Sequence, residues 1–385
     1  MIARLLKDID ALLITNSTNI RYLTGFVGAA PQEREAYALL TQNLGYLFTN
    51  SLYRESAKNI QCPMPNVQWK PVEISREEPF EKKLAQVLTR SDPALQGPTL
   101  RSIRLGFEEN DLTVTEFTKL QKELKGIKLI PTQGIVEKLR MIKRDDEIDN
   151  IRQASKLTDL CFDYIIKKLK PDVTEWQIVW EIEAFIRTRG AELAFSPIAA
   201  FGKNSSQPHY DPKRSDLLRL KGPTLQKQDV ILLDFGARVN GYCSDMTRVV
   251  FVGKPKDEWV KAYEVVLTAQ QCALKYLHLK GIKAHLPGGV WASGAQLDRI
   301  ARKIIERGGW PAYPHSLGHG VGLDIHEAPR LTIKKDHKLK PYMVITVEPG
   351  IYIEGQYGIR IEDLVLLKRD GIEILSKSPK ELTIL

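Results

Sequence analysis

Two pairs of acidic residues follow apolar segments in the second half of the chain. Asp234 ends the segment DVILLD, and Asp245 follows after an Asn-Gly dipeptide typical of a tight turn, so the two carboxylates can face each other across a hairpin. Glu348, after MVITV, and Glu362, inside GIRIEDLVLL, are also separated by a turn-rich connection. Either pair alone could be an exposed face or a salt bridge to Arg360. Facing carboxylates repel each other, however, so two such pairs together favour a cation site.

Histidine supplies a further kind of metal ligand. Three of the seven histidines, His315, His319 and His326, lie in the segment HSLGHGVGLDIHE, and His319 stands between two glycines that allow close approach to a partner. Four carboxylates and one imidazole exceed the needs of one tetrahedral zinc. They suit two divalent ions, such as Mn, Co, Fe or Zn, that are bridged by carboxylates. Two such ions bind a water between them, lower its pKa and polarise the carbonyl that the water attacks.

The composition is that of an ordinary globular chain and excludes several functions. The 385 residues are 43% hydrophobic and 27% charged, and no apolar run is long enough for a membrane span. The formal net charge is +9, but the basic residues are spread along the chain instead of forming a nucleic-acid-binding patch. The N-terminus lacks a secretory signal and the cysteines form no CxxC pair, which predicts a reduced, cytoplasmic compartment.

The elements that must position these residues fall into two domains. Residues 1–134 alternate strand-like and helical segments, which predicts a smaller α/β domain that ends near Gly134. The expected strands are 11–15, 37–42 and 44–50, and the expected helices are 77–90 and 114–126.

Residues 135–385 separate helices from a run of β-branched segments, which predicts an α+β catalytic domain built on one sheet. A helical stripe runs from Ile148 to Ile165, and Thr174 with Gln177 predicts a capping box at the start of the next helix. The other expected helices are 257–280 and 295–307, and the expected strands are 229–239, 247–253, 343–353 and 358–368.

The order and flanking residues of the five candidate ligands resemble those of the pita-bread metallopeptidases, which include prolidase, aminopeptidase P and methionine aminopeptidase. The five are Asp234, Asp245, His319, Glu348 and Glu362. This resemblance covers the chain from about residue 135 to its end. The first domain resembles the creatinase/prolidase N-terminal domain through the segment NIRYLTGFVG. Methionine aminopeptidases generally lack that domain, so the resemblance implies a hydrolase of the bond between an N-terminal residue and proline.

The resemblance also implies how each residue acts. Asp234 would chelate one metal, Asp245 and Glu362 would bridge two metals, and His319 with Glu348 would complete the second, with Mn the most expected ion. A hydroxide that bridges the metals would attack the scissile carbonyl.

Further residues would serve catalysis or bind substrate. Glu348 would take the proton of the attacking water, His326 would hydrogen-bond the scissile carbonyl oxygen, and His209, in the segment QPHY, would contact the substrate near the scissile bond. In the substrate-binding group, His315 would line the proline pocket, Arg330 would hold the substrate carboxylate, and Arg360 would orient carboxylates. The expected partners are small peptides with proline at the second position and a second copy of the chain in a homodimer.

Several alternatives remain at this stage. A creatinase-like amidinohydrolase would lack the metal ligands, and a non-catalytic pita-bread binding or scaffold protein would have lost some of them. The segment GHGVG lacks the spacing of a dinucleotide-binding loop. Within the peptidase reading, Arg330 in HEAPR favours a dipeptidase. The segment TNSLYRE in the first domain departs from the acidic TDxRY-like word of relatives and keeps an aminopeptidase P open.

Overall fold

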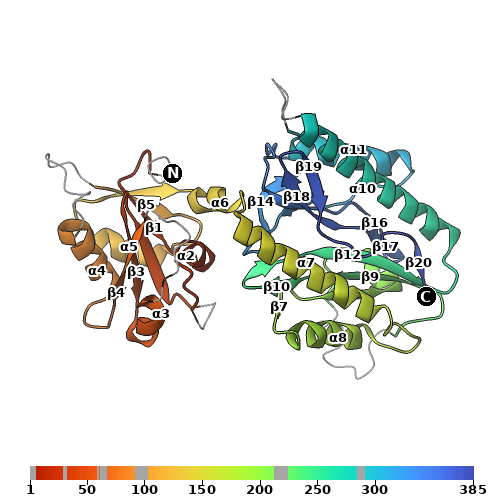
Figure 1. Ribbon diagram of the computed structural model, residues 1–385, viewed down its shortest axis with the longest axis horizontal. Coiled ribbons are helices and arrows are strands. Elements are labelled where there is room, and N and C mark those ends of the chain that lie inside the picture. The colour runs from red at the N-terminus through yellow and green to blue at the C-terminus, as the bar shows by residue number, and fades with distance from the viewer. Residues whose placement is uncertain are drawn as a thin grey trace. The chain divides into compact units, whose positions relative to one another are not determined.

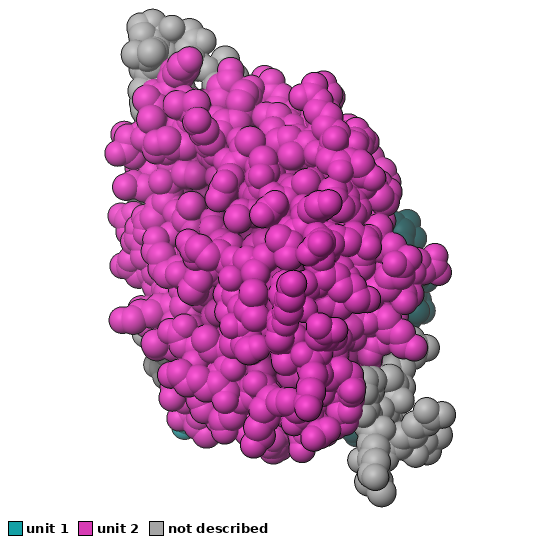
Figure 2. Space-filling view, turned by 90° about the vertical axis from the view of Figure 1, so that its right-hand side faces the viewer, with its two compact units in different colours: residues 1–139 teal, residues 140–385 magenta. Residues whose placement is uncertain are grey.

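The computed structural model describes residues 6–28, 33–58, 60, 67–91, 103–211, 224–283 and 291–385. The chain divides into two compact units, residues 1–139 and 140–385, which are drawn in different colours in Figure 2. The sequence pattern places the domain boundary near Gly134, and the division in the structure falls within the following short helix α6 (Ile135–Arg140).

Unit 1 contains a six-stranded mixed sheet with the strand order β4-β3-β2-β1-β5-β6 (Figure 1). The central strands pack buried side chains such as Leu13, Phe48 and Leu105 against Phe80 and Leu120 of the helices. The strands are β1 (Ala11–Ile14), β2 (Ala36–Leu40), β3 (Leu44–Thr49), β4 (Gln68–Glu73), β5 (Arg104–Glu108) and β6 (Lys128–Thr132). The helices are α2 (Ser17–Thr24), α3 (Arg54–Lys58), α4 (Phe80–Gln86), which runs into the π-helical turn η2 (Val87–Ser91), and α5 (Val114–Glu123).

Helix α2 is an element that the hydrophobic pattern did not predict, although it contains most of the segment NIRYLTGFVG. The side chain of Asn16 accepts a hydrogen bond from the backbone N–H of Asn19 and caps the helix. Gly25 ends it in the left-handed conformation, with φ of 72°. The helix is short, so its capping residues are a clearer signal than its periodicity.

Unit 2 places its strands between two groups of helices (Figure 1). The strands of this unit form four sheets within the described residues, and the expectation of one sheet was wrong. Strands β9 (Asp229–Phe235) and β12 (Met246–Val252) are buried along their whole length. The helices are α7 (Asp145–Ile165), α8 (Glu175–Arg187), α10 (Asp257–Lys283) and α11 (Gly294–Arg307).

Alternation along β9 decides which way its acidic residue points. Ile231 and Leu233 belong to the core that includes α7 and α8, whereas Val230 and Leu232 belong to the core that includes α10 and α11. Successive side chains of a strand point to opposite faces, so Asp234 lies on the same face as Val230 and Leu232.

The remaining strands connect these layers. β9 and β12 lie in the sheet β20-β12-β9-β8, and β13, β14, β15, β18 and β19 form the sheet β14-β13-β15-β18-β19. Their bounds are β7 (Glu192–Leu193), β8 (Ile198–Phe201), β10 (Ala237–Val239), β11 (Tyr242–Cys243), β13 (Gly318–Gly320), β14 (Glu327–Leu331), β15 (Val344–Val347), β16 (Gly350–Ile353), β17 (Tyr357–Arg360), β18 (Asp363–Lys368), β19 (Gly371–Ile374) and β20 (Thr383–Ile384).

Three of the expected strands are interrupted at an acidic residue or within two residues of one. The segment 229–239 divides at Gly236 into β9 and β10, and only glycine fits at this position because a side chain would lie 1.9 Å from the carbonyl oxygen of Ser244. The segment 343–353 divides at Glu348, and the segment 358–368 divides at Glu362. Each interruption takes the chain out of one sheet, which a β-branched pattern cannot show because it continues on both sides.

The predicted helix starts are confirmed in unit 2. Thr174 and Gln177 form the expected capping box of α8, with the Thr174 side chain accepting from the backbone N–H of Gln177. Ser293 and Gln296 form a second capping box on α11. Among the described residues, no helix combines the length and apolar character needed to cross a membrane.

Candidate active site

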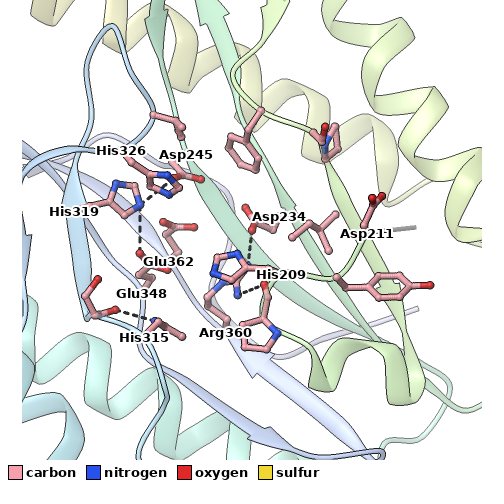
Figure 3. Close-up of a pocket in the computed structure, with 18 of the residues that line it drawn as sticks. His209, Asp211, Asp234, Asp245, His315, His319, His326, Glu348, Arg360 and Glu362 are labelled. Carbon is pink, nitrogen blue, oxygen red and sulfur yellow. Dashed lines mark hydrogen bonds and ion pairs between the residues drawn. The ribbon is translucent and has the colours of Figure 1, made fainter. Parts of the chain in front are cut away.

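All the residues to which the sequence assigns a role line one cavity of about 400 Å³ in unit 2. Figure 3 shows the five candidate ligands turned toward the middle of this cavity, with His315, His319 and His326 on one side and Asp211 on the other. The sequence-predicted lining residues are His209, Asp234, Asp245, His315, His319, His326, Arg330, Glu348, Arg360 and Glu362.

The predicted hairpin brings the two aspartates together. Asn240 and Gly241 have φ of 49° and 89°, which is the turn geometry that an Asn-Gly pair favours between antiparallel strands. β9 and β12 then pair with Phe235 opposite Met246, so Asp245 follows the turn beside the end of β9. Asp234 is opposite Thr247 in the same register. The two carboxylates therefore enter the cavity from neighbouring strands.

The two glutamates reach the cavity where two strand pairs meet. Val347 of β15 pairs with Asp363 of β18, and Gly350 of β16 pairs with Arg360 of β17. Glu348 lies between β15 and β16, and Glu362 lies between β17 and β18. At both points the chain passes from one sheet to the other. The side chain of Glu348 is 15% exposed, and Glu362 is buried.

His319 presents a lone pair to the carboxylates. Its Nδ1 lies 3.1 Å from the carbonyl oxygen of Gly320, so Nδ1 carries the proton and donates it to that oxygen. Burial lowers the pKa of His319 to about 3, which keeps the ring neutral. The unprotonated Nε2 then lies 3.6 Å from Asp245 Oδ2 and 3.4 Å from Glu348 Oε1. A cation placed among these three atoms would satisfy all of their lone pairs.

The electrostatics of the four carboxylates lead to the same conclusion. Burial and the neighbouring carboxylates raise the pKa of Asp245 and of Glu362 well above their ordinary values. Burial raises the pKa of Glu348 to about 7. Asp234 Oδ2 accepts from Arg360 Nη2, but the buried Asp234 Oδ1 has no hydrogen-bond partner in the part of the chain that the structure describes.

The donor set fits divalent metal ions. Ligand atoms of Asp245, His319 and Glu362 all lie within 4.8 Å of one another. Hard carboxylate oxygens with one imidazole nitrogen are suitable for Mn, Co, Fe or Zn. One guanidinium cannot neutralise four carboxylates, so bound cations would remove both the mutual repulsion and the orphaned Asp234 oxygen.

A register shift places a second histidine beside His319. Opposite β14, His319 pairs with Arg330 and its neighbour Gly320 pairs with Glu327, so β14 carries extra residues at this point. The ring of His326 stands 4.5 Å from the ring of His319 in an edge-to-face arrangement. Burial lowers the pKa of the partly exposed His326, so this ring too is neutral at pH 7.

The remaining predicted residues differ in how firmly they are held. His315 Nε2 lies 3.0 Å from the Tyr352 hydroxyl, and burial lowers the pKa of His315 to about 3. Arg360 is buried, and besides Asp234 it donates to Thr247 Oγ1 at 2.9 Å and to the Tyr352 hydroxyl at 2.9 Å. Arg330 is exposed on the cavity rim.

Sequence reasoning missed the apolar wall of the cavity and its supporting tyrosines. The wall consists of Phe195, Pro197, Ile198 and Ile325, which carry no signal that separates them from ordinary core residues. Tyr210 also lines the cavity, and its place in the segment QPHY could have indicated it.

Comparison with known proteins identifies the family. The sequence model of metallopeptidase family M24 matches residues 149–369, and that of the creatinase/prolidase N-terminal domain matches residues 6–142. The chain belongs to metallopeptidase family M24. The predicted α+β pita-bread domain preceded by a smaller creatinase/prolidase-type domain is thereby confirmed, and the enzyme is a metallopeptidase.

Relatives of this M24 enzyme match it over nearly its whole length. An uncharacterized peptidase of Bacillus subtilis is 37% identical over 98% of this chain and 96% of its own. A structure titled Xaa-Pro dipeptidase from Bacillus anthracis is 34% identical with a TM-score of 0.82, covering 100% of this chain and 99% of that one. The X-Pro aminopeptidase from Thermotoga maritima is 31% identical with a TM-score of 0.80, covering 99% of this chain and 100% of the other.

Proposed function

We propose that this M24 enzyme hydrolyses the peptide bond between an N-terminal residue and proline with two divalent metal ions. The observation that carries the proposal is the convergence of four carboxylates and one neutral imidazole on one cavity with a single bonded guanidinium. The specificity for proline is supported by the structural relatives, which are titled Xaa-Pro dipeptidase, X-Pro aminopeptidase and prolidase.

We assign the ligands as the geometry allows. Asp234 would hold one ion, Asp245 and Glu362 would lie between both, and His319 with Glu348 would hold the other, with Mn the expected metal. When bound, such ions supply Lewis-acid polarisation of the substrate carbonyl and a water of lowered pKa. The complete ligand set gives no support to a non-catalytic scaffold.

The protein side chains have separate tasks in this reaction. The carboxylate of Glu348 is accessible from the cavity and would accept the proton of the attacking water. The neutral His326 would donate an N–H to the scissile carbonyl oxygen as charge builds on it. His209 would contact the substrate near the scissile bond from the opposite wall. His315, held by Tyr352, would line the proline pocket.

We further propose that the enzyme is a dipeptidase. A dipeptidase must recognise the free carboxylate that directly follows the proline, and a cation at that end of the cavity provides the recognition. Arg330 lies on the rim in the strand that follows His326, so its guanidinium is available to a substrate. A cytoplasmic location and a homodimer remain predictions of the sequence.

One experiment tests both the reaction and the substrate length. The purified enzyme, stripped of metal and reloaded with Mn, Co or Zn, is given Leu-Pro, Leu-Pro-Gly and Leu-Ala. We expect metal-dependent release of leucine from Leu-Pro, slower release from Leu-Pro-Gly and little from Leu-Ala. Faster cleavage of the tripeptide would make the enzyme an aminopeptidase, and equal cleavage of Leu-Ala would remove the specificity for proline.

A further inference from the structure

His209 belongs to a segment that has no helix or strand to hold it. Residues 207–211 follow the short helix η4 (Gly202–Ser206) as turns and coil. Within this segment His209 is exposed, whereas the next residue, Tyr210, is 8% exposed. A reacting side chain works only if it is held within a fraction of an ångström of its productive position. The position of His209 therefore depends on the contacts that its neighbours in the chain make.

The buried carboxylate of Glu175 provides the strongest of these contacts. Glu175 is the first residue of α8 and is 0% exposed. Its Oε2 accepts from the Tyr210 hydroxyl at 2.7 Å, and its Oε1 accepts from the backbone N–H of Phe201 at 2.6 Å and from Asn204 Nδ2 at 2.9 Å. Charge-assisted bonds and the helix N-terminus together stabilise a negative charge at this buried position.

The same cluster closes on itself and spans the whole turn before His209. Asn204 Nδ2 also lies 3.0 Å from the Tyr210 hydroxyl, so both ends of the segment 201–210 are bonded to one carboxylate. On the other side of His209, the carbonyl oxygen of Pro208 accepts from Arg360 Nη1 at 3.1 Å. His209 is thus an exposed ring between two tethered neighbours, and one tether leads to a candidate metal ligand through Arg360.

We propose that Glu175 and Tyr210 are positioning residues that fix the His209 ring in the cavity. The hydroxyl of Tyr210 donates to the buried carboxylate of Glu175, so Tyr210 acts on His209 through the backbone that the two residues share. This inference rests on the proposed function only for its kinetic consequence. The placement of the ring is a structural statement that can be measured without substrate.

The test removes one oxygen atom and follows His209 directly. In Tyr210→Phe, loaded with diamagnetic Zn, we expect the NMR signal of the His209 Cε1–Hε1 group to shift or broaden while the other histidine signals stay in place. His209→Ala assigns that signal. The matched control is Tyr164→Phe, which removes a hydroxyl that donates to Glu181 on the same helix α8, outside the cavity. An unchanged His209 signal in Tyr210→Phe overturns the proposal.

Kinetics then separate a positioning role from a general loss of structure. We expect Tyr210→Phe to lower kcat for Leu-Pro about tenfold, because a displaced catalytic group misses its productive geometry. Against a His209→Ala background the same substitution should change kcat less than about twofold, since a double-mutant cycle shows whether two residues act through each other. An equal loss in both backgrounds overturns the proposal.

A second substitution covers the case in which Tyr210→Phe does not fold. Glu175→Gln keeps an acceptor for Phe201 and Asn204 and offers its amide to Tyr210, so we expect a smaller loss of kcat than in Glu175→Leu and the same dependence on His209. Identical kcat values in Glu175→Gln, Glu175→Leu and the unaltered enzyme contradict the proposal. If the unaltered enzyme does not cleave Leu-Pro, the proposed function fails and the NMR result still decides the positioning role.

Discussion

Two adjacent residues, Glu362 and Asp363, carry buried carboxylates into opposite environments. Asp363 is 0% exposed, and Arg248 Nη2 donates to its Oδ1 at 2.9 Å while Lys380 Nζ bonds its other oxygen. Glu362 is 2% exposed and accepts from Thr247 Oγ1 at 2.8 Å. Its charged neighbours in the cavity are chiefly other carboxylates, and they help to raise its pKa.

The difference separates a structural charge cluster from a functional one. Around Asp363 the chain supplies two cations, so the negative charge is compensated when the protein folds. We call Asp363, Arg248 and Lys380 the closed cluster. Around Glu362 the carboxylates of Asp234, Asp245 and Glu348 outnumber the guanidinium of Arg360, so the chain supplies too few cations and the site is suited to bind ions from solution; we call these four acids the open cluster. Burial alone does not distinguish the two acids. The sign of the charges that surround each carboxylate does.

The largest effect on turnover should come from breaking the open cluster. Asp245→Asn removes a ligand that both ions would share, and we expect a loss of about 10³-fold or more in kcat because several kcal/mol of transition-state stabilisation disappear. Metal content per subunit, measured by atomic emission after gel filtration, should fall in parallel. Full metal content in this variant would contradict the assignment of Asp245 as a shared ligand.

A second effect divides the two neighbouring histidines. His326→Ala should lower kcat by about 10²–10³-fold, because one donor to the developing oxyanion is lost, while metal content stays near that of the unaltered enzyme. His319→Ala should lose metal together with activity. Equal metal retention in the two variants would contradict the assignment of His319 as a metal ligand and of His326 as a hydrogen-bond donor to the substrate.

A smaller effect is expected at the rim of the open cluster. Arg330→Ala should raise KM for Leu-Pro about tenfold and leave KM for Leu-Pro-amide nearly unchanged, because only a free carboxylate meets the guanidinium. The exposed position of Arg330 keeps this effect below that of a buried ion pair. A similar rise in KM for both substrates would assign Arg330 to another part of the peptide.

The smallest effect on turnover, with a large effect on stability, should come from the closed cluster. Asp363→Asn leaves Arg248 and Lys380 without their partner, and we expect the free energy of unfolding to fall by about 3–5 kcal/mol. Urea unfolding measures this loss. Turnover per folded, metal-loaded molecule should stay within about twofold, a change of under 0.5 kcal/mol in the barrier. Loss of metal in this variant would show that the two clusters are not independent.

Metal addition sharpens the same contrast. A ligand that binds only the folded state stabilises it, by about 2.7 kcal/mol at 100 times its Kd. Mn should therefore raise the unfolding midpoint of the unaltered enzyme and of Asp363→Asn, and it should have little effect on Asp245→Asn. Equal shifts in all three proteins would place the stabilising ion outside the cavity.

The sequence by itself predicted the candidate ligand set and most of the elements that carry it. Asp234 and Asp245 were predictable because an Asn-Gly turn and alternating strands act over a few residues, and the capping box at Thr174 is equally local. The residues with candidate roles could be singled out because carboxylates and histidines are unusual in apolar or glycine-rich segments. All of them line one cavity. The assigned roles of these residues stay predictions until the variants are measured.

Only the tertiary structure decided which buried acids are closed by the chain and which are left open. Glu362 and Asp363 belong to the same apolar segment of the sequence. Their difference arises from Arg248 of β12 and from Lys380, which both lie outside that segment and reach Asp363 only in the folded chain. The interruption of the expected strands at Glu348 and Glu362, and the cluster of Glu175 with Tyr210, likewise depend on segments brought together by folding. Local patterns report how a residue meets its near neighbours, whereas the sign of the charge it meets across a sheet is set by packing.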